Sequence, residues 1–487
     1  MTAFDWYKFM NVIIDENPQK AFLVAVQLPR VSDAEIQSSL KELSRLVTTL
    51  GYEVIGQTSQ RRASERGGTV LGDGKLKEVA SWTGGTGVVG PLVVKKKHKA
   101  ALRFKKNQEE EEDEILEADD LDADLDYSVQ EEDPQEIGTA APKKEQADVL
   151  VVDCELSPSQ IRNLESATGA KVLDRTGVII EIFSRHARTK AAKLQVEIAR
   201  LKYIAPRLRE TLGGEDRQGG GTGSKGLGET SIELDRRKIR DRIKELRDEL
   251  RSIANEHNVR RSRREQEITV ALVGYTNAGK SSLMRSLTGS DVYIADKLFA
   301  TLDTTIRIMQ PESKPKILIS DTVGFIKKLP HDLVASFKST LDEALNASLL
   351  LYVVDCADPT FRSQLQVTKK VLAEVGAQDI ESKIILNKID KVSEEERQLL
   401  AAEFPEAIQM CSLKKEDVSE LREKLIKHFE SSMTDQEIFI PYDVQGAIGD
   451  IRGKLKVLSE EYGERGLILK VRGDDDDILK IKNKFGL

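Results

Sequence analysis

One Gly-rich segment with a fixed spacing constrains the fold of this chain more than any other feature. Residues 274–281 read Gly-Tyr-Thr-Asn-Ala-Gly-Lys-Ser, a GxxxxGKS pattern, and they follow an apolar run over 268–273. After the pattern, Leu283 and Leu287 repeat at helical spacing. A buried strand, a phosphate-binding loop and a helix are therefore predicted in that order, which is typical of a doubly wound α/β domain with a mostly parallel sheet.

Each residue type in such a loop has a physical role. Gly274 and Gly279 let the backbone wrap a polyphosphate, whose oxygens accept main-chain N–H groups at the helix N-terminus. Lys280 would reach the β- and γ-phosphates, and the Ser281 hydroxyl would bind Mg²⁺. The alternative, a glycine turn with an exposed lysine, does not explain the strand and helix patterns on either side. The residues expected to contact the phosphates are Gly274, Asn277, Ala278, Gly279, Lys280, Ser281 and Ser282.

A second motif indicates which base is bound. Asn387-Lys388-Ile389-Asp390 follows the apolar run 384–386, so an NKxD sequence stands at a predicted strand end. The Asp390 carboxylate can accept from the N1–H and the exocyclic amine of guanine, which adenine does not offer. A site built for that pattern can reject adenine by factors of about 10⁴ or more. Ser412 and Leu413, in Cys411-Ser412-Leu413, are expected to direct main-chain N–H groups at the guanine carbonyl, although this segment departs from the usual Ser-Ala-x.

Between these motifs lies a predicted metal site. Asp321-Thr322-Val323-Gly324 follows an apolar run, so Asp321 is expected to hold Mg²⁺ through water and the Gly324 N–H to sense the γ-phosphate. The Thr-rich stretch 299–305 has the composition of a first switch. Thr301 is the favoured switch ligand, with Thr304 and Thr305 as alternatives that spacing does not separate. The predicted metal ligands are Ser281, Thr301 and Asp321, and the predicted catalytic residues are Lys280, Thr301 and Gly324.

The residue after Gly324 is Phe325, where Ras-like proteins usually carry a water-orienting Gln. A phenyl ring cannot orient or polarise water, so unassisted hydrolysis is expected to be slow and another group must complete the site. Phe325 is then either a packing residue or part of a switch that needs a partner.

The region before the loop divides into two parts. Residues 1–186 are expected to form a small α/β domain interrupted by an acidic, disordered insertion over about 95–147. Residues 107–142 contain 16 Asp or Glu and no Lys or Arg, so the rest of a chain with a net charge of −8 carries about +8. The insertion either modulates RNA affinity or is a solvated segment without a role. Strands are predicted at 21–26, 87–89, 149–152 and 178–182, a helix through Ile36, Leu40, Leu43 and Leu46, and a tight turn before a helix at Gly72-Asp73-Gly74-Lys75.

Residues 187–264 have a different pattern. Two apolar stripes at helical spacing flank the segment 213–228, in which eight of sixteen residues are glycine. This pattern predicts two antiparallel helices with a flexible tip. Arg217, Lys225 and the basic residues that follow would suit a narrow anionic space, since phosphate contacts give affinity without sequence readout. An ordinary solvated coiled coil is the alternative. The stripes are Leu194, Ile198, Leu201 and Leu208, and then Ile239, Ile243, Leu246, Leu250 and Ile253.

After the nucleotide domain, assigned to 265–430, residues 431–487 are expected to form a small α/β domain. Its predicted elements are strands at 438–442 and 466–471, a helix over 447–462, and a solvated turn at 474–477.

Composition limits the class of protein. The chain has 487 residues, lacks a run of about 18 apolar residues, and does not begin like a signal peptide. We therefore expect a soluble, cytoplasmic protein without integral membrane association. We also expect a monomer that has no DNA partner. Cys154, Cys356 and Cys411 lack paired metal spacing, so buried thiols are predicted.

Taken together, the motifs resemble those of HflX-type GTPases of the Obg-HflX superfamily, over nearly the whole chain. Lys225 and Leu227 stand where Arg and Pro are common in that family. Besides 274–281 and 321–325, the resemblance rests on Gly72-Asp73-Gly74-Lys75, Asp174-Arg175-Thr176-Gly177, Gln195-Val196-Glu197, Pro206-Arg207-Leu208, Gly226-Leu227-Gly228-Glu229, Asp235-Arg236-Arg237 and Phe299-Ala300-Thr301-Leu302-Asp303.

The resemblance implies a Mg²⁺-dependent GTPase that binds GTP and GDP and associates with the large ribosomal subunit and its rRNA. It also implies GTP-dependent dissociation of stalled or idle ribosomes into subunits under stress, with hydrolysis stimulated by the ribosome. Two alternatives share the switch chemistry. A large-subunit assembly GTPase would bind precursor particles, and a non-ribosomal signalling switch would use the hairpin for a protein partner.

Overall fold

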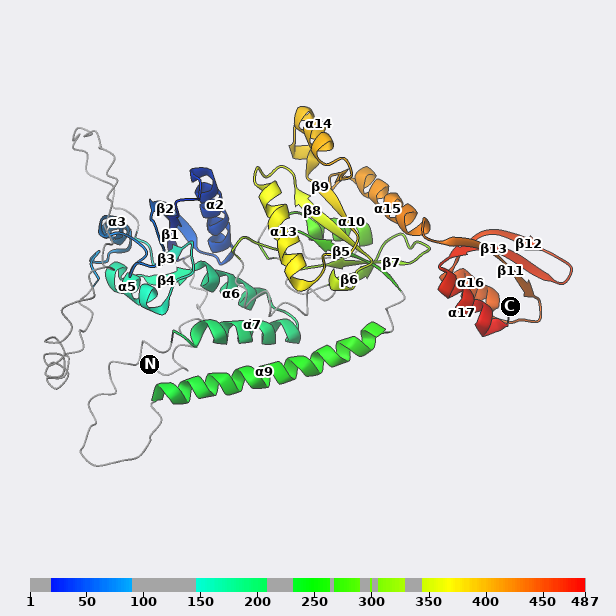
Figure 1. Cartoon of the computed structure of the whole chain (residues 1–487), viewed down its shortest axis with the longest axis horizontal. Coiled ribbons are helices and arrows are strands. Elements are labelled where there is room, and N and C mark those ends of the chain that lie inside the picture. The colour runs from blue at the N-terminus through cyan, green and yellow to red at the C-terminus, as the bar shows by residue number, and fades with distance from the viewer. Residues whose placement is uncertain are drawn as a thin grey trace, which may run out of the picture.

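The structure, a computed structural model, describes residues 19–89, 146–207, 231–262, 267–289, 298–299, 305–328 and 344–486. Three sheets follow one another along the longest axis, and the long helix α9 (Ser231–Ser262) lies beside the first two (Figure 1). Within the described ranges, no helix combines the length and the apolar character needed to cross a membrane. Cys154, Cys356 and Cys411 are buried free thiols, as predicted.

The first sheet has four parallel strands in the order β2-β1-β3-β4. The strands predicted at 21–26 and 149–152 and the helix through Ile36 are confirmed. Gly72 begins a helix, also as predicted, because its extended backbone leads directly into the first turn. The elements of this N-terminal unit are β1 (Lys20–Gln27), α2 (Asp33–Thr49), β2 (Glu53–Arg61), α3 (Asp73–Thr83), β3 (Val149–Val152), α5 (Pro158–Thr168), β4 (Lys171–Asp174) and α6 (Arg175–His186).

Two predicted strands of this unit are wrong. Residues 178–182 lie in α6, whose N-cap Asp174 accepts the Gly177 N–H at 2.7 Å and so starts a helix directly after β4. The helix is buried on nearly every side, and an apolar run of that kind does not distinguish a helix from a strand. Residues 87–89 contain a bend and no strand. They follow the end of α3 at Gly84, where φ is +82°, and Val88 is exposed and not packed into a sheet.

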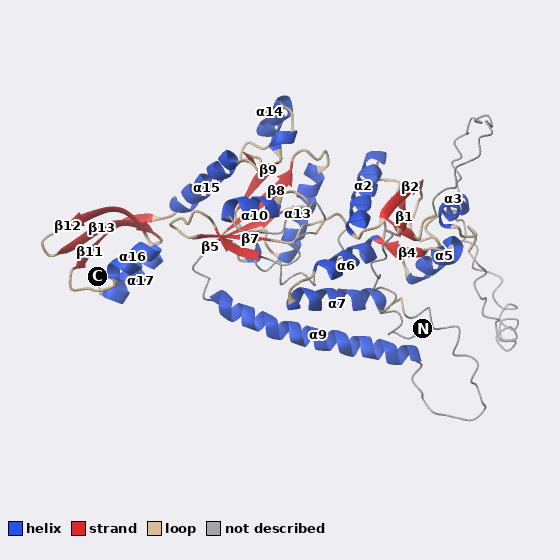
Figure 2. Cartoon of the chain, turned by 180° about the vertical axis from the view of Figure 1, so that it is seen from behind, coloured by secondary structure: helices blue, strands red, loops and turns tan. Residues whose placement is uncertain are grey.

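The predicted helical hairpin consists of α7 (Lys190–Ile204) and α9, which lie side by side in both views (Figures 1 and 2). Leu194, Ile198 and Leu246 form its buried core. Ion pairs join Lys190 to Glu249 and Arg242 to Glu197. Since residue numbers fall on one helix as they rise on the other, the helices are antiparallel. Leu208 and the segment 213–228 lie outside the described residues.

The second sheet has six strands in the order β10-β9-β8-β5-β7-β6, and only the edge strand β6 is antiparallel to its neighbour. Each predicted strand, at 268–273, 317–320 and 384–386, lies in it, which confirms the doubly wound α/β fold. Its elements are β5 (Ile268–Val273), α10 (Lys280–Thr288), β6 (Thr305–Ile308), β7 (Ile317–Asp321), β8 (Leu349–Asp355), α13 (Phe361–Val375), β9 (Ser382–Asn387), η1 (Ile389–Lys391), α14 (Glu394–Glu403), β10 (Ile408–Gln409) and α15 (Lys415–Glu430).

The C-terminal unit is a three-stranded antiparallel sheet, β11-β13-β12, with two helices. The two predicted strands are confirmed, but the predicted helix over 447–462 ends at Lys454 because the following residues pair with β13 as a further strand. The predicted turn at 474–477 instead caps and begins a helix, where carboxylates favour the N-terminal dipole. The elements are β11 (Thr434–Pro441), α16 (Ala447–Lys454), β12 (Lys456–Tyr462), β13 (Gly466–Gly473) and α17 (Asp475–Phe485).

The N-terminal unit and the nucleotide unit share one apolar core. The buried cluster that includes Val178 and Phe183 of α6 continues through Tyr275, Val323 and Phe325. The rings of Phe183 and Phe299 meet edge to face with centroids 4.5 Å apart. The start of the predicted first switch therefore packs on the N-terminal unit.

Candidate nucleotide site

The predicted phosphate loop connects β5 to α10, as the motif requires. Gly279 caps the helix with φ of +96°, and a Cβ there would lie 2.2 Å from the Asn387 Nδ2 atom. No side chain caps this N-terminus among the described residues, and the N-terminus of a helix, with its first-turn N–H groups, is suited to bind an anion. The loop therefore has both the curvature and the donors that a polyphosphate needs.

Lys280 is buried inside the loop, where its ammonium donates to the carbonyls of Gly274 and Tyr275 at 3.0 and 2.9 Å. Burial lowers the pKa of Lys280 to about 8, and the nearby Asp321 carboxylate opposes that shift. An anion placed in the loop would remove the cost of burying this charge. The geometry thus favours a negatively charged ligand at this position.

The predicted metal ligands Ser281 and Asp321 come together from two elements. Ser281 lies in the first turn of α10 and donates its hydroxyl to Asp321 Oδ2 at 2.7 Å, and Asp321 is the last residue of β7. A hydroxyl and a buried carboxylate are oxygen donors of the kind that Mg²⁺ prefers, so these residues fit the ion. The third predicted ligand, Thr301, and the alternative Thr304 lie outside the described residues. Thr305 begins β6 and pairs with Asp321 across the sheet edge.

Gly324 packs against the phosphate loop. A Cβ at this residue would lie 2.8 Å from Thr276 Cγ2 and 3.2 Å from Lys280 Nζ, so only glycine leaves the space beside the lysine open. The buried Thr276 hydroxyl has no hydrogen-bond partner among the described residues. A cradle kept open by glycine and a hydroxyl available for bonding fit a phosphate group.

Phe325 is a packing residue. Its side chain is buried, its N–H donates to the Gly274 carbonyl at 3.1 Å, and its carbonyl accepts the Thr276 N–H at 2.8 Å. The ring therefore belongs to the apolar core, and water for hydrolysis must be oriented by another group.

The NKxD residues lie at the end of β9, beside the phosphate loop. Asn387 donates to the Ala278 carbonyl at 2.8 Å and accepts the Ser412 N–H at 3.0 Å. Lys388 Nζ donates to the Asn277 carbonyl at 2.8 Å and to Asp355 at 2.7 Å. These bonds bring together the three sequence segments that are predicted to hold phosphate and base.

Asp390 is the residue predicted to select guanine. It lies in η1 with an exposed side chain, and a hydrogen bond with Cys411 lowers the pKa of its carboxyl, which favours the charged acceptor. Ser412 is buried, whereas the Leu413 side chain is exposed, so only the backbone of residue 413 suits the predicted role.

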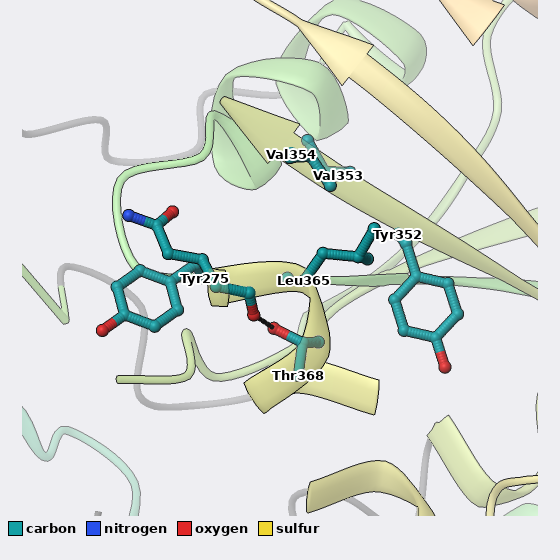
Figure 3. Close-up of a pocket in the computed structure, with 8 residues that line it drawn as sticks. Tyr275, Tyr352, Val353, Val354, Leu365 and Thr368 are labelled. Atoms are coloured by element: carbon teal, nitrogen blue, oxygen red, sulfur yellow. Dashed lines mark hydrogen bonds between the residues drawn. The ribbon is translucent and has the colours of Figure 1, made fainter. Parts of the chain in front are cut away.

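A small apolar pocket lies behind the loop and is lined by Tyr275, Tyr352, Leu365 and Thr368, among others (Figure 3). The hydroxyls of the two tyrosines point away from each other and from the pocket (Figure 3). The pocket is too small for a ligand, and its lining does not suit phosphate. It lies between β8 and α13 and does not extend the nucleotide site.

Two side chains of the N-terminal unit reach the nucleotide unit without belonging to any predicted site. The Tyr275 hydroxyl donates to Glu42 of α2 at 2.7 Å, and Arg175 of α6 reaches the Lys327 carbonyl at 3.1 Å. In the sequence, Arg175 stands out only through the segment Asp174-Arg175-Thr176-Gly177 of the family resemblance. Glu42 lies in no recognisable motif, because its partner Tyr275 is 233 residues away in the sequence.

Three family models match the chain in sequence order. The model described as GTP-binding GTPase N-terminal matches residues 37–98 and 117–184, and that described as GTP-binding GTPase Middle Region matches 186–264. The model described as 50S ribosome-binding GTPase matches 269–388.

Known proteins are similar to this chain over most of its length. The GTPase HflX of Gluconacetobacter diazotrophicus is 53% identical over 465 residues, which cover 96% of this chain and 97% of that protein. The GTPase HflX of Caldanaerobacter subterraneus is 35% identical, covering 93% of this chain and 90% of that protein. A solved GTP-binding protein from Sulfolobus solfataricus, in complex with GDP, is 23% identical, with a TM-score of 0.40, covering 84% of this chain and 98% of that protein.

Proposed function

This chain belongs to the HflX family of GTPases, and we propose that it uses bound GTP to separate stalled or idle ribosomes into subunits. Binding and hydrolysis of GTP are the activity of the family. Attachment to the large subunit and its rRNA, and a role under stress, are our proposals. The observation that carries them is a basic helical hairpin attached to a nucleotide site in one chain.

The hairpin supports an RNA partner. Near its tip, α9 exposes the cations Arg237, Lys238, Arg240 and Lys244. Arg242, in the same stretch, is used to hold α7 through Glu197. An exposed row of Lys and Arg beside a glycine-rich segment suits phosphate backbones, which it would bind without reading sequence. The match of residues 269–388 to the 50S ribosome-binding family is consistent with that partner.

The proposed chemistry follows from the site. The first turn of α10 and Lys280 would hold the β- and γ-phosphates, and Asp390 with Asn387 would fix the guanine. Mg²⁺, held through Ser281, Asp321 and a switch threonine such as Thr301, would neutralise charge on the phosphates when bound. The Gly324 N–H would then report whether a γ-phosphate is present. Because Phe325 cannot orient water, rapid hydrolysis would await a group supplied by the ribosome.

Light scattering and phosphate release on purified ribosomes test this function. The protein is mixed with intact ribosomes and GTP, GDP or a non-hydrolysable GTP analogue, and with isolated large subunits. Scattering should fall with GTP and with the analogue but not with GDP, and large subunits should accelerate phosphate release.

Other outcomes of that experiment would redirect the assignment. Stimulated hydrolysis without a fall in scattering would replace splitting by large-subunit assembly or quality control. If neither signal responds to ribosomes or subunits, the ribosomal proposal fails while the GTPase activity stands, and a protein-directed switch becomes the working hypothesis.

A further inference from the structure

Arg175 connects the N-terminal unit to the nucleotide unit. It is the first residue of α6 and is 2% exposed, although it carries a permanent charge. One nitrogen, Nη1, donates to Asp153 at 2.7 Å, and the other, Nη2, donates to Glu42 at 2.9 Å and to the Lys327 carbonyl at 3.1 Å. Lys327 follows Gly324 by three residues, so Arg175 touches the segment expected to respond to the γ-phosphate.

Tyr275 of the phosphate loop holds the same two partners. Its hydroxyl donates to Glu42 Oε1 at 2.7 Å and accepts the Lys327 N–H at 2.6 Å. Arg175, Glu42, Tyr275 and Lys327 therefore form a closed ring of hydrogen bonds. Two members of the ring belong to the N-terminal unit, one to the phosphate loop, and one to the segment after Asp-Thr-Val-Gly. We call these four residues the Arg175 ring.

Asp153 adds a second buried charge to this contact. Lys328 donates to the Asp153 carboxylate at 3.0 Å and to its carbonyl at 2.8 Å. Burial alone would raise the pKa of Asp153, but Arg175 and Lys328 lower it below its ordinary value. Buried charges of this kind are costly when one partner moves away, so the contact favours a defined arrangement of residues 327 and 328.

Asp174, the residue before Arg175, holds the hairpin. Its fully buried carboxylate accepts the Tyr203 hydroxyl at 2.7 Å and the Arg207 guanidinium at 2.9 Å. The Arg207 guanidinium also stacks over the Tyr203 ring, 3.4 Å from its centroid. Tyr203 lies in the last turn of α7 and Arg207 in the turn that follows, directly before the segment that leads to the glycine-rich tip.

We propose that the adjacent residues Asp174 and Arg175 couple the nucleotide site to the hairpin, so that the presence of a γ-phosphate changes how firmly the end of α7 is held. When residues 324–328 shift with the nucleotide, the Arg175 ring opens or closes and α6 adjusts at its first turn. Asp174, which caps that turn, transmits the change to Tyr203 and Arg207. The coupling acts in the free protein and does not depend on any ribosomal role.

Hydrogen exchange read by mass spectrometry tests the coupling in the full-length protein. Peptides covering 196–207 are compared in saturating GDP and in a saturating non-hydrolysable GTP analogue, so that changes in affinity do not enter. In the wild-type protein, exchange at the end of α7 should differ about fivefold or more between the two states, the usual size of a coupling between sites.

Three variants and one matched control make the test specific. Tyr275→Phe removes a single oxygen from the Arg175 ring. Arg175→Lys replaces the guanidinium, with its two Nη donors, by one ammonium. Asp174→Asn removes the negative charge that binds Tyr203 and Arg207. Each should collapse the nucleotide-dependent difference at 196–207. Arg185→Gln, on the same helix, should preserve it, because Arg185 bonds to Glu181 and to the Leu50 carbonyl, neither of which belongs to the Arg175 ring.

Reciprocity supplies an independent readout. If the hairpin senses the nucleotide, Asp174→Asn must change the ratio of analogue to GDP affinity by the factor that the nucleotides impose on the end of α7. The double variant Arg175→Lys, Tyr275→Phe should lose no more of the nucleotide-dependent exchange difference than the more affected single variant, since both residues bond to Glu42 and Lys327. Equal wild-type exchange in the two nucleotide states, or a wild-type difference retained in both Tyr275→Phe and Arg175→Lys, would overturn the proposal.

Discussion

In each of the first two units, a glycine caps the N-terminus of a helix and a lysine lies in its first turn, yet the two lysines have different hydrogen-bond partners. In the N-terminal unit, Lys75 donates to Glu78 at 2.7 Å and to Thr58 at 3.2 Å, and the Gly72 N–H donates to the Gln60 side chain. In the nucleotide unit, Lys280 is buried and hydrogen-bonds to carbonyls of its own loop. A turn whose groups are already paired has little left for a ligand, and only the second is suited to bind phosphate.

Replacing each lysine by alanine should give the largest difference in GTP binding and turnover between two variants. Lys280→Ala should weaken GTP binding or turnover by about 100-fold or more, because it removes the cation placed for the phosphates. Lys75→Ala should leave both within about twofold, since it removes an ion pair with Glu78 and a hydrogen bond to Thr58 outside the nucleotide site. Titration with a fluorescent GTP analogue and phosphate release measure the two variants. Full activity in Lys280→Ala would end the phosphate-loop assignment.

Base selection should change next most strongly. Asp390→Asn should raise the ratio of xanthine to guanine nucleotide affinity by about 10²-fold or more. The reason is that the amide can donate to the oxygen that xanthine carries in place of the exocyclic amine. Competition between GTP and XTP for the labelled nucleotide gives the ratio. Asp379→Asn, at an exposed position before β9, is the matched control. An unaltered preference for guanine in Asp390→Asn would contradict the role given to the NKxD motif.

Gly324→Ala should have an intermediate effect. Its methyl group would lie 3.2 Å from Lys280 Nζ and closer still to Thr276, so hydrolysis should fall by about 10- to 100-fold while GDP binding changes less. Single-turnover hydrolysis and GDP titration separate these quantities. Equal losses in both would mean that the methyl group disturbs the whole loop and that the γ-phosphate role of Gly324 is wrong.

Gly74→Ala should have the smallest effect and the opposite sign. No heavy atom lies within 4 Å of a Cβ at this position, and the residue is helical, so alanine should stabilise α3 by up to about 1 kcal/mol. A small rise in thermal unfolding midpoint, with unchanged GTP binding, is expected. A loss of nucleotide affinity would show that the N-terminal turn takes part in the site after all.

The sequence predicted the nucleotide unit well because its strands are short apolar runs that end in chemically distinctive residues, such as Asp321 and Asn387. It predicted less where an apolar run is buried on several sides. The run 178–182 reads as a strand, and only the capping bond from Asp174 makes it a helix. The residues after Lys454 pair with β13, a contact that helical spacing does not report.

The contact between units could not be predicted for a different reason. Arg175 and Glu42 are joined across 133 residues, and Tyr275 adds a partner 233 residues from Glu42. No local pattern encodes such distances, and the Tyr in the phosphate loop matches a position where the motif allows any residue. The coupling role that we propose for these side chains rests on their burial and geometry.

The length of α9 has a mechanical consequence. Its 32 residues span about 48 Å, and its last residue stands six positions before β5 of the nucleotide sheet. A tilt of roughly 10° at that end would carry the other end through about 8 Å, given the rise of ~1.5 Å per residue. The helix is thus a lever arm, and an adjustment of atomic size beside the nucleotide can become a displacement as large as a nucleotide base.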